Sequence, residues 1–320
     1  MSLSAEILKQ LYYEMLRIRM VEEKIVELYP EQEMRCPIHL CIGQEAIAVG
    51  VCANLSKDDF VLSGHRCHGH YLAKGGDLKA MIAELYGKVT GCSKGKGGSM
   101  HLIDLSAGFL GATPIVGSTI PIAVGVAFGS VLRGKQNVTV VFFGDAATEE
   151  GVFHESINFA VLKRLPIVFV CENNLYSVYS SLSVRQPQGR EIFCLAKGHG
   201  IDSYQGDGND VIKAYALSQQ AICKAKKGDG PTFLEFKTYR WREHCGPNYD
   251  NQLGYRTESE FQYWKQRCPI EMIKERLIKE GIISNQDIID IVKKLEHEIE
   301  EAVLLAKKSP FPVHEEFVKL

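Results

Sequence analysis

The chain of 320 residues is 45% hydrophobic, which is enough to bury one large or two small hydrophobic cores. Its formal net charge of -2 offers no basic surface for nucleic acid or an acidic membrane, and no apolar run approaches the roughly 20 residues that cross a bilayer. The ten cysteines are scattered without a Cys-x-x-Cys pair, which favours a reducing compartment over a disulfide framework.

The first predicted element is an amphipathic helix. Apolar residues recur at helical spacing over residues 4–29, with Ser4 as the predicted N-cap, and Pro30 ends the helix. From about residue 36 to 245, glycine-rich turns alternate with short apolar strands and helices. This alternation predicts an α/β fold, in which helices cover both faces of a mostly parallel sheet.

Two apolar runs within this region, 138–143 and 167–171, predict consecutive buried strands. Residues 147–165 carry apolar side chains at helical spacing, so they are predicted to form the connecting helix. A later strand is expected at 232–239, followed by a polar loop over 243–256.

The last part of the chain is predicted to be helical. Thr257 and Glu260 have the spacing of a capping box, Ser284 is expected to cap the final helix, and Pro310 to end it. The predicted domain organisation is a helical arm over residues 1–35, an α/β domain over 36–256 and a helical extension over 257–320.

Two polar residues follow the predicted strands at their carboxyl ends, where open α/β sheets bind ligands. Asp145 follows the first strand and Asn174 the second. A carboxylate and an amide oxygen that converge there suit Mg²⁺, which keeps diphosphate oxygens among its ligands. The simpler alternative is an acidic residue at the start of an ordinary helix, so this motif needs support from the rest of the chain.

Histidine, arginine and glycine gather in two further segments. Arg66 lies in a histidine-rich segment, and residues 95–101 form a glycine-rich loop whose spacing is not that of a Walker A loop. An arginine beside glycine-rich backbone would balance diphosphate charge, and imidazoles near a cofactor could move protons at neutral pH. Residues 206–210 look like a second cofactor motif, but we expect a turn there. Six residues considered as zinc ligands match no structural zinc spacing: Cys36, His39, Cys41, His65, His68 and His70.

The motif around Asp145 and Asn174 resembles that of thiamine diphosphate enzymes. The resemblance implies that Asp145, Asn174 and the backbone carbonyl of Tyr176 hold Mg²⁺ on the diphosphate. Ala146 stands where the family usually has glycine, which requires a negative φ at this position.

Almost the whole chain resembles the alpha subunit of the decarboxylating component of 2-oxo acid dehydrogenase complexes (pyruvate, acetoin and branched-chain types). The matching segments are the first helix, His39 with 43–45, 65–70, 95–101, 115–117, the Mg²⁺ motif and 238–240. The resemblance therefore implies a thiamine diphosphate-binding fold with helical N- and C-terminal extensions.

The resemblance also implies roles for individual residues. His39 and His244 are the expected catalytic residues, at the 2-oxo acid site and next to the cofactor respectively. Arg66 and His65 would grip the diphosphate, with His65 at a position that is tyrosine in pyruvate-type subunits. The remaining cofactor-binding residues are Val116, which supports the aminopyrimidine, and Gly144, Asp145, Ala146, Ala147, Asn174 and Tyr176. Cys245 replaces the serine that is phosphorylated in mitochondrial relatives, so kinase control is not expected there.

The activity implied by the resemblance is oxidative decarboxylation of a 2-oxo acid such as pyruvate, or cleavage of acetoin. It also implies an α₂β₂ assembly with a beta subunit, which supplies the glutamate that activates the cofactor, and acyl transfer to a lipoyl-bearing acyltransferase. Half of a split transketolase and a non-catalytic cofactor-binding regulatory protein are the alternatives. Transit peptides are poor in acidic residues, whereas Glu6 and Glu14 lie in the first part of this chain, so we expect a cytoplasmic protein.

Overall fold

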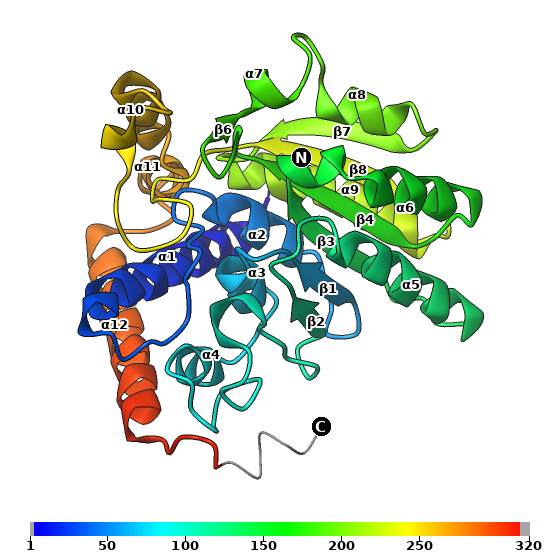
Figure 1. Cartoon of the computed structure of the whole chain (residues 1–320). Coiled ribbons are helices and arrows are strands. Elements are labelled where there is room, and N and C mark those ends of the chain that lie inside the picture. Colours follow the sequence, from blue (N-terminus) through cyan, green and yellow to red (C-terminus); the bar gives the residue numbers. More distant parts are fainter. Residues whose placement is uncertain (1–2, 314–320) are drawn as a thin grey trace.

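The predicted buried apolar runs belong to a six-stranded sheet in the computed structural model, which describes residues 3–313 (Figure 1). All neighbouring strands are parallel, in the order β2-β1-β3-β4-β8-β7. The strands are β1 (Phe60–Ser63), β2 (Phe109–Ala112), β3 (Thr139–Gly144), β4 (Ile167–Asn173), β7 (Asp202–Asp207) and β8 (Thr232–Lys237). A separate antiparallel hairpin pairs β5 (Tyr176–Ser177) with β6 (Ser180–Ser181). The predicted α/β fold with a mostly parallel sheet is confirmed.

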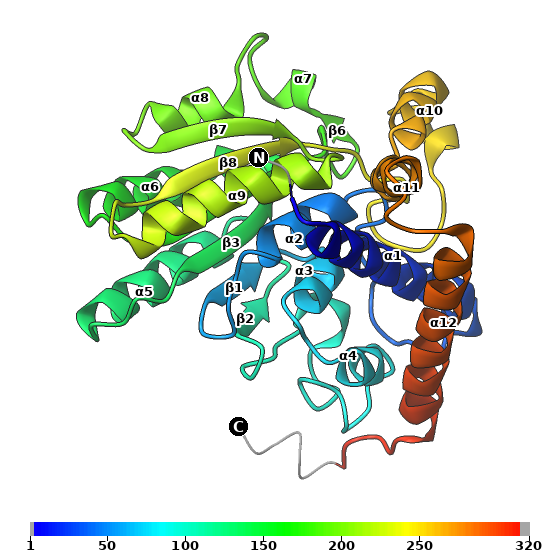
Figure 2. The ribbon, with the colours of Figure 1, turned by 180° about the vertical axis from the view of Figure 1, so that it is seen from behind.

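Side chains alternate between the two faces of the sheet and build two hydrophobic clusters. In β3, Val140 and Phe142 belong to one cluster, and Val141 and Phe143 to the other. Figures 1 and 2 show the helices of both layers from opposite sides. The cluster of Val140 includes residues of α1 (Ala5–Leu28), α2 (Glu45–Cys52) and α9 (Val211–Lys226). The cluster of Val141 includes residues of α5 (Thr119–Leu132), α6 (Gly151–Leu162) and α8 (Ile192–Lys197).

The first helix, α1, begins and ends as predicted. The Ser4 side chain accepts a hydrogen bond from the Ile7 N–H at 3.3 Å, and Pro30 lies in a 3₁₀ turn directly after the helix. Two further helices, α3 (His68–Ala73) and α4 (Leu78–Leu85), follow β1. Near the end of the chain, Ser284 and Asp287 form a complete capping box, so the predicted cap is also confirmed.

Three helices follow near the end of the chain, and two of them pack against the first helix. The three are α10 (Glu258–Gln266), α11 (Pro269–Lys279) and α12 (Asn285–Lys308), of which α11 and α12 contact α1. Arg17 of α1 is ion-paired with Glu298 of α12 at 2.7 Å, and α12 also runs beside α4 (Figure 2). Buried residues of α1, α11 and α12 share one hydrophobic cluster with the sheet. The division into three segments stays a prediction.

Three predicted details differ in the structure. Residues Asp145–Glu149 form a 3₁₀ helix, because the extended backbone of Glu150 separates them from α6. The strand predicted to reach residue 239 ends at Lys237, and the chain then leaves the sheet. Only half of the capping box at Thr257 forms: Thr257 accepts a bond from the Glu260 N–H, but the Glu260 carboxylate accepts one from the Tyr176 hydroxyl at 2.6 Å.

Other expectations from the sequence are met, one of them in part. All ten cysteines are free thiols. None of the helices in residues 3–313 is long and apolar enough to cross a bilayer. The turn expected at 206–210 is shorter than predicted: Gly206 and Asp207 end β7, residues 208–209 form the turn, and Asp210 caps α9.

The glycine-rich loop wraps around a carboxylate of the chain itself. Glu84 of α4 is fully buried and accepts hydrogen bonds from the N–H groups of Ser93, Gly95, Gly97 and Gly98, at 2.7 to 3.0 Å. Backbone N–H groups arranged in this way bind anions. Since Glu84 already accepts bonds from these donors, the loop binds a carboxylate of the chain itself. Arg66 is then the residue in this part of the chain that is still expected to bind a diphosphate.

Replacing Glu84 with alanine is expected to lower the free energy of unfolding by about 3 kcal/mol or more, because four partly buried N–H donors would lose a charged, fully buried acceptor. Urea unfolding followed by circular dichroism measures the change. Glu275→Ala, at an exposed position of α11, is the control and should alter stability by no more than about 0.5 kcal/mol. Equally small effects of the two substitutions would show that Glu84 does not hold the loop.

Candidate active site

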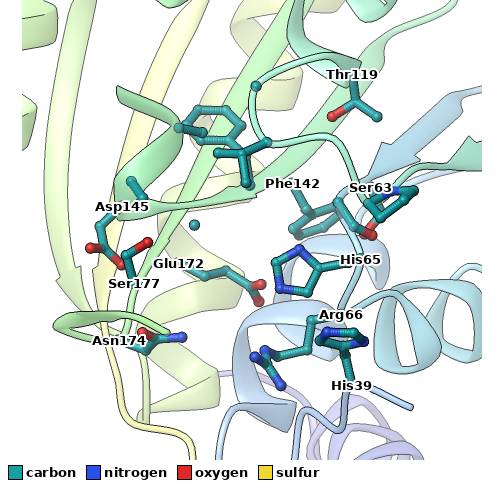
Figure 3. A pocket seen from close by; sticks show the side chains of 18 of the residues that line it. His39, Ser63, His65, Arg66, Thr119, Phe142, Asp145, Glu172, Asn174 and Ser177 are labelled. Atoms are coloured by element: carbon teal, nitrogen blue, oxygen red, sulfur yellow. The ribbon is translucent and has the colours of Figure 1, made fainter. Parts of the chain in front are cut away.

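One cavity lies where the carboxyl ends of several strands meet, and it brings together every site residue predicted from the sequence. Figure 3 shows Asp145 and Asn174 on one side and His39, His65 and Arg66 on the other. The predicted residues that line it are His39, His65, Arg66, Val116, Gly144, Asp145, Ala146, Ala147, Asn174, Tyr176 and His244. Strands β1, β3 and β4 each deliver part of this set from their carboxyl ends, which is where ligands bind in open α/β folds.

The predicted metal ligands lie on two neighbouring strand ends. Gly144 of β3 is in register with Glu172 of β4, so Asp145 and Asn174 leave the sheet side by side. Asn174 donates from Nδ2 to Gln44 Oε1 at 3.3 Å and accepts at Oδ1 from the Tyr176 N–H at 3.2 Å, which fixes the orientation of its amide. The second contact keeps Asn174 and Tyr176, two of the three predicted metal ligands, in one turn after β4.

Backbone geometry around these ligands is unusual in two places. Leu175 has a φ of 72° and Val178 a φ of 52°, both in the left-handed region that non-glycine residues rarely adopt. Each such residue costs roughly 1–3 kcal/mol, and this kind of strain gathers at functional sites. Ala146, by contrast, does not have a positive φ, so the backbone accommodates its methyl group, as the resemblance to the glycine-containing motif requires.

The donor set fits a hard divalent cation. Asp145 is 1% exposed, and burial raises the pKa of its carboxyl group, while Arg185 acts in the opposite direction. A buried carboxylate of this kind is stabilised by a nearby cation. Carboxylate, amide and backbone carbonyl oxygens are ligands of the class that Mg²⁺ takes in proteins.

Arg66 provides positive charge on the opposite wall. It is 7% exposed, and its guanidinium donates to the carbonyl oxygens of Leu40 at 2.6 Å and His244 at 3.2 Å. Burial, with a further contribution from Arg240, lowers the pKa of Arg66 to about 10. No ion pair of Arg66 occurs within residues 3–313. A buried guanidinium that contacts only carbonyl groups and an imidazole is suited to bind an anion such as a diphosphate.

Three histidines meet beside Arg66. The ring centroids of His39, His65 and His244 are separated by 4.8 to 5.4 Å. Burial first, and the guanidinium of Arg66 second, lower their pKa values, to about 3 for His39, about 2 for His65 and about 4 for His244. All three are therefore neutral at physiological pH, and His39 Nδ1 is buried without a hydrogen-bond partner among residues 3–313. Each neutral imidazole offers a lone pair to a bound reactant, and the low pKa makes its protonated form a strong proton donor.

The geometry of these three imidazoles would allow them to bind a metal ion, because one nitrogen of each lies within 4.8 Å of the others. Electrostatics opposes it, since Arg66 Nη2 is only 3.5 Å from His244 Nδ1. The six residues considered as zinc ligands from the sequence do not all lie together. His68 and His70 are instead buried in hydrogen bonds to the carboxylates of Glu22 and Glu172, both at 3.0 Å.

Several residues of the site were not singled out from the sequence. Glu22 of α1 accepts bonds from the Cys41 N–H at 2.9 and 3.0 Å as well as from His68, so it fixes the segment that carries His39. Glu172 lines the cavity, and Arg185 is paired with Asp145. Glu22 could have been noticed in the sequence, because it is a charged residue on the apolar face of the first helix. No pattern in the sequence pointed to Arg185.

The chain matches the family described as the dehydrogenase E1 component over residues 13–315. It is 38% identical over 323 residues to the alpha subunit of acetoin:2,6-dichlorophenolindophenol oxidoreductase from Bacillus subtilis, covering 99% of this chain and 94% of that protein. It is 37% identical over 309 residues to the pyruvate dehydrogenase E1 component subunit alpha of Porphyra purpurea (94% and 89%). The corresponding Rickettsia bellii subunit is 36% identical over 305 residues (95% and 92%).

Replacing His65 with tyrosine is expected to make stability less sensitive to acid. As pH falls below 6.5, the unfolded chain binds a proton at this histidine that the folded protein does not bind, because the folded pKa is about 2. Wild-type stability therefore falls with pH, and removing one such histidine should reduce the slope by about 1 kcal/mol per pH unit between pH 6 and 4.5.

Urea unfolding at several pH values measures this slope. His297→Tyr, at a position of α12 whose side chain is 76% exposed, is the control and should leave the slope unchanged. If both variants keep the wild-type slope, His65 is not held neutral by the fold.

Proposed function

The chain belongs to the dehydrogenase E1 component family as the alpha subunit of a thiamine diphosphate-dependent oxidoreductase, and we propose that it decarboxylates a small 2-oxo acid such as pyruvate, or cleaves acetoin. The observation that carries the proposal is the cavity in which Asp145 and Asn174 face Arg66 and three neutral imidazoles. The family match over residues 13–315 favours this function over half of a split transketolase or a non-catalytic regulatory protein.

We assign the cofactor contacts to the two walls of the cavity. Asp145, Asn174 and the carbonyl of Tyr176 would hold Mg²⁺, and Arg66 with His65 would bind the diphosphate. Val116 lines the same cavity and would support the aminopyrimidine. When bound, thiamine diphosphate supplies a nucleophilic carbon and accepts the electron pair released by decarboxylation.

His39 and His244 are the proposed proton carriers. Both are neutral, both line the cavity, and their ring centroids are 5.1 Å apart. A proton taken up by either imidazole would be repelled by the adjacent Arg66, so it would be returned readily to an oxygen of the reactant. His39 Nδ1, which has no partner in the part of the chain described, is the atom we expect to act.

A beta subunit is the proposed partner, in an α₂β₂ assembly that passes its acyl product to a lipoyl-bearing acyltransferase. The carboxylates that line the cavity, Asp145 and Glu172, are already bonded to Arg185 and His70. Neither is free to activate the cofactor, so we assign that role to a carboxylate of the partner. Ile115, which lines the cavity and is 69% exposed, offers an apolar surface for the beta subunit. The free thiols favour the cytoplasm as its compartment.

The metal assignment is tested by replacing Asp145 with alanine. Mg²⁺-dependent affinity for thiamine diphosphate should fall by about 100-fold or more, because the metal would lose its charged protein ligand. Isothermal titration calorimetry on the full chain with its partner subunit measures this. Asp229→Ala, at an exposed position, should bind as the wild type does. Unchanged affinity of Asp145→Ala would refute the metal assignment.

The partner assignment is tested by activity of the separated subunits. The purified alpha chain is expected to decarboxylate pyruvate or cleave acetoin at less than about 1% of the rate of the complex, since loss of a group that acts in proton transfer costs about 10²–10⁴-fold. Adding the beta subunit should restore the activity. Full turnover by the isolated chain would contradict a site shared between subunits.

A further inference from the structure

Arg185 connects the metal-binding turn to the segment that follows β6. This arginine is the last residue of the short helix α7 (Leu182–Arg185), and its side chain is 11% exposed. One of its Nη atoms is ion-paired with Asp145 Oδ2, and the other with Glu149 Oε1. The guanidinium therefore bridges two carboxylates from the 3₁₀ helix that follows β3.

The position of Arg185 is itself fixed by further contacts. Its Nε donates to the Ser180 carbonyl at 3.2 Å, so each of its three nitrogens has an acceptor. Glu149 also accepts a bond from Gln186 Nε2 at 3.1 Å, and Gln186 is 7% exposed. A guanidinium held from three directions has little freedom to turn away from Asp145.

Arg185 holds Asp145 through one carboxylate oxygen, Oδ2. A backbone hydrogen bond within Asp145 also reaches the carboxylate, and the residue lines the cavity. Mg²⁺ requires nearly ideal octahedral geometry, so the direction of each ligand oxygen matters. Carboxylates that bind metals are usually themselves hydrogen-bonded by a second residue, which sets that direction.

We propose that Arg185 is a positioning residue for the metal site, which holds Asp145 by Oδ2 so that Oδ1 is presented to Mg²⁺. The inference rests on the proposed function and adds to it a residue that touches neither the metal nor the cofactor. The competing interpretation is that Arg185 neutralises Asp145 only until Mg²⁺ displaces it. The two interpretations predict opposite effects on affinity when the arginine is removed.

The test is calorimetric titration of thiamine diphosphate into the full chain with its partner subunit, in saturating Mg²⁺ and separately in saturating Ca²⁺. Arg185→Gln is expected to weaken binding by about 10–100-fold with Mg²⁺. With Ca²⁺, which accepts flexible geometry, the loss should be several times smaller. Arg185→Lys keeps the charge but cannot bridge two carboxylates in the same way, so it should lie between the wild type and Arg185→Gln.

Two further variants control for folding and for charge. Arg190→Gln removes an exposed arginine five residues away and should bind like the wild type. Glu149→Gln removes the charge of one partner of Arg185 but leaves Asp145 paired. It should therefore weaken thiamine diphosphate binding by a smaller factor than Arg185→Gln does, and again by more with Mg²⁺ than with Ca²⁺. The melting temperature of each cofactor-free variant shows whether it is folded.

The inference is overturned if Arg185→Gln binds as tightly as the wild type or more tightly, or if it loses the same factor with both metals. Either result with normal wild-type binding leaves the proposed function intact. Absence of thiamine diphosphate binding by the wild type itself would instead refute the proposed function, and this inference with it.

Discussion

The parallel pairing of β3 with β4 is the constraint on which the site depends. The register places Gly144 opposite Glu172, so the two strands end at the same edge of the sheet, within a residue or two of each other. Asp145 and Asn174 are brought together by this pairing although 29 positions of the sequence separate them. The flanking cores hold the register, because the side chains of β3 alternate between two different hydrophobic clusters.

Charge is distributed unevenly over the cavity. Arg66 and the three histidines form one wall, where burial and the guanidinium keep the imidazoles neutral. The opposite wall carries Asp145, whose negative charge is balanced by Arg185. An anionic ligand that brings its own divalent cation satisfies both walls, because the anion meets the guanidinium and the cation meets the carboxylate.

The residues that could be predicted from the sequence are those placed by local pattern. Asp145 and Asn174 directly follow apolar strands, and their position at the sheet edge follows from parallel pairing alone. Glu84 and Glu260 could not be predicted in the same way, since each carboxylate bonds to a partner outside its own helix. The glycine-rich loop was an ambiguous signal for this reason: a backbone nest binds a phosphate or an internal carboxylate equally well, and only the fold brings Glu84 into it.

The order of the strands also sets a distance across the site. β1, β3 and β4 are neighbours in the sheet, and Arg66 and Asn174 follow the two outer strands of this trio. Adjacent strands are about 4.8 Å apart, so these two ends are separated by about 10 Å across the sheet edge. A ligand that contacts both must span this gap. In the proposed assignment, a metal ion beside Asn174 and a diphosphate beside Arg66 would span this gap together.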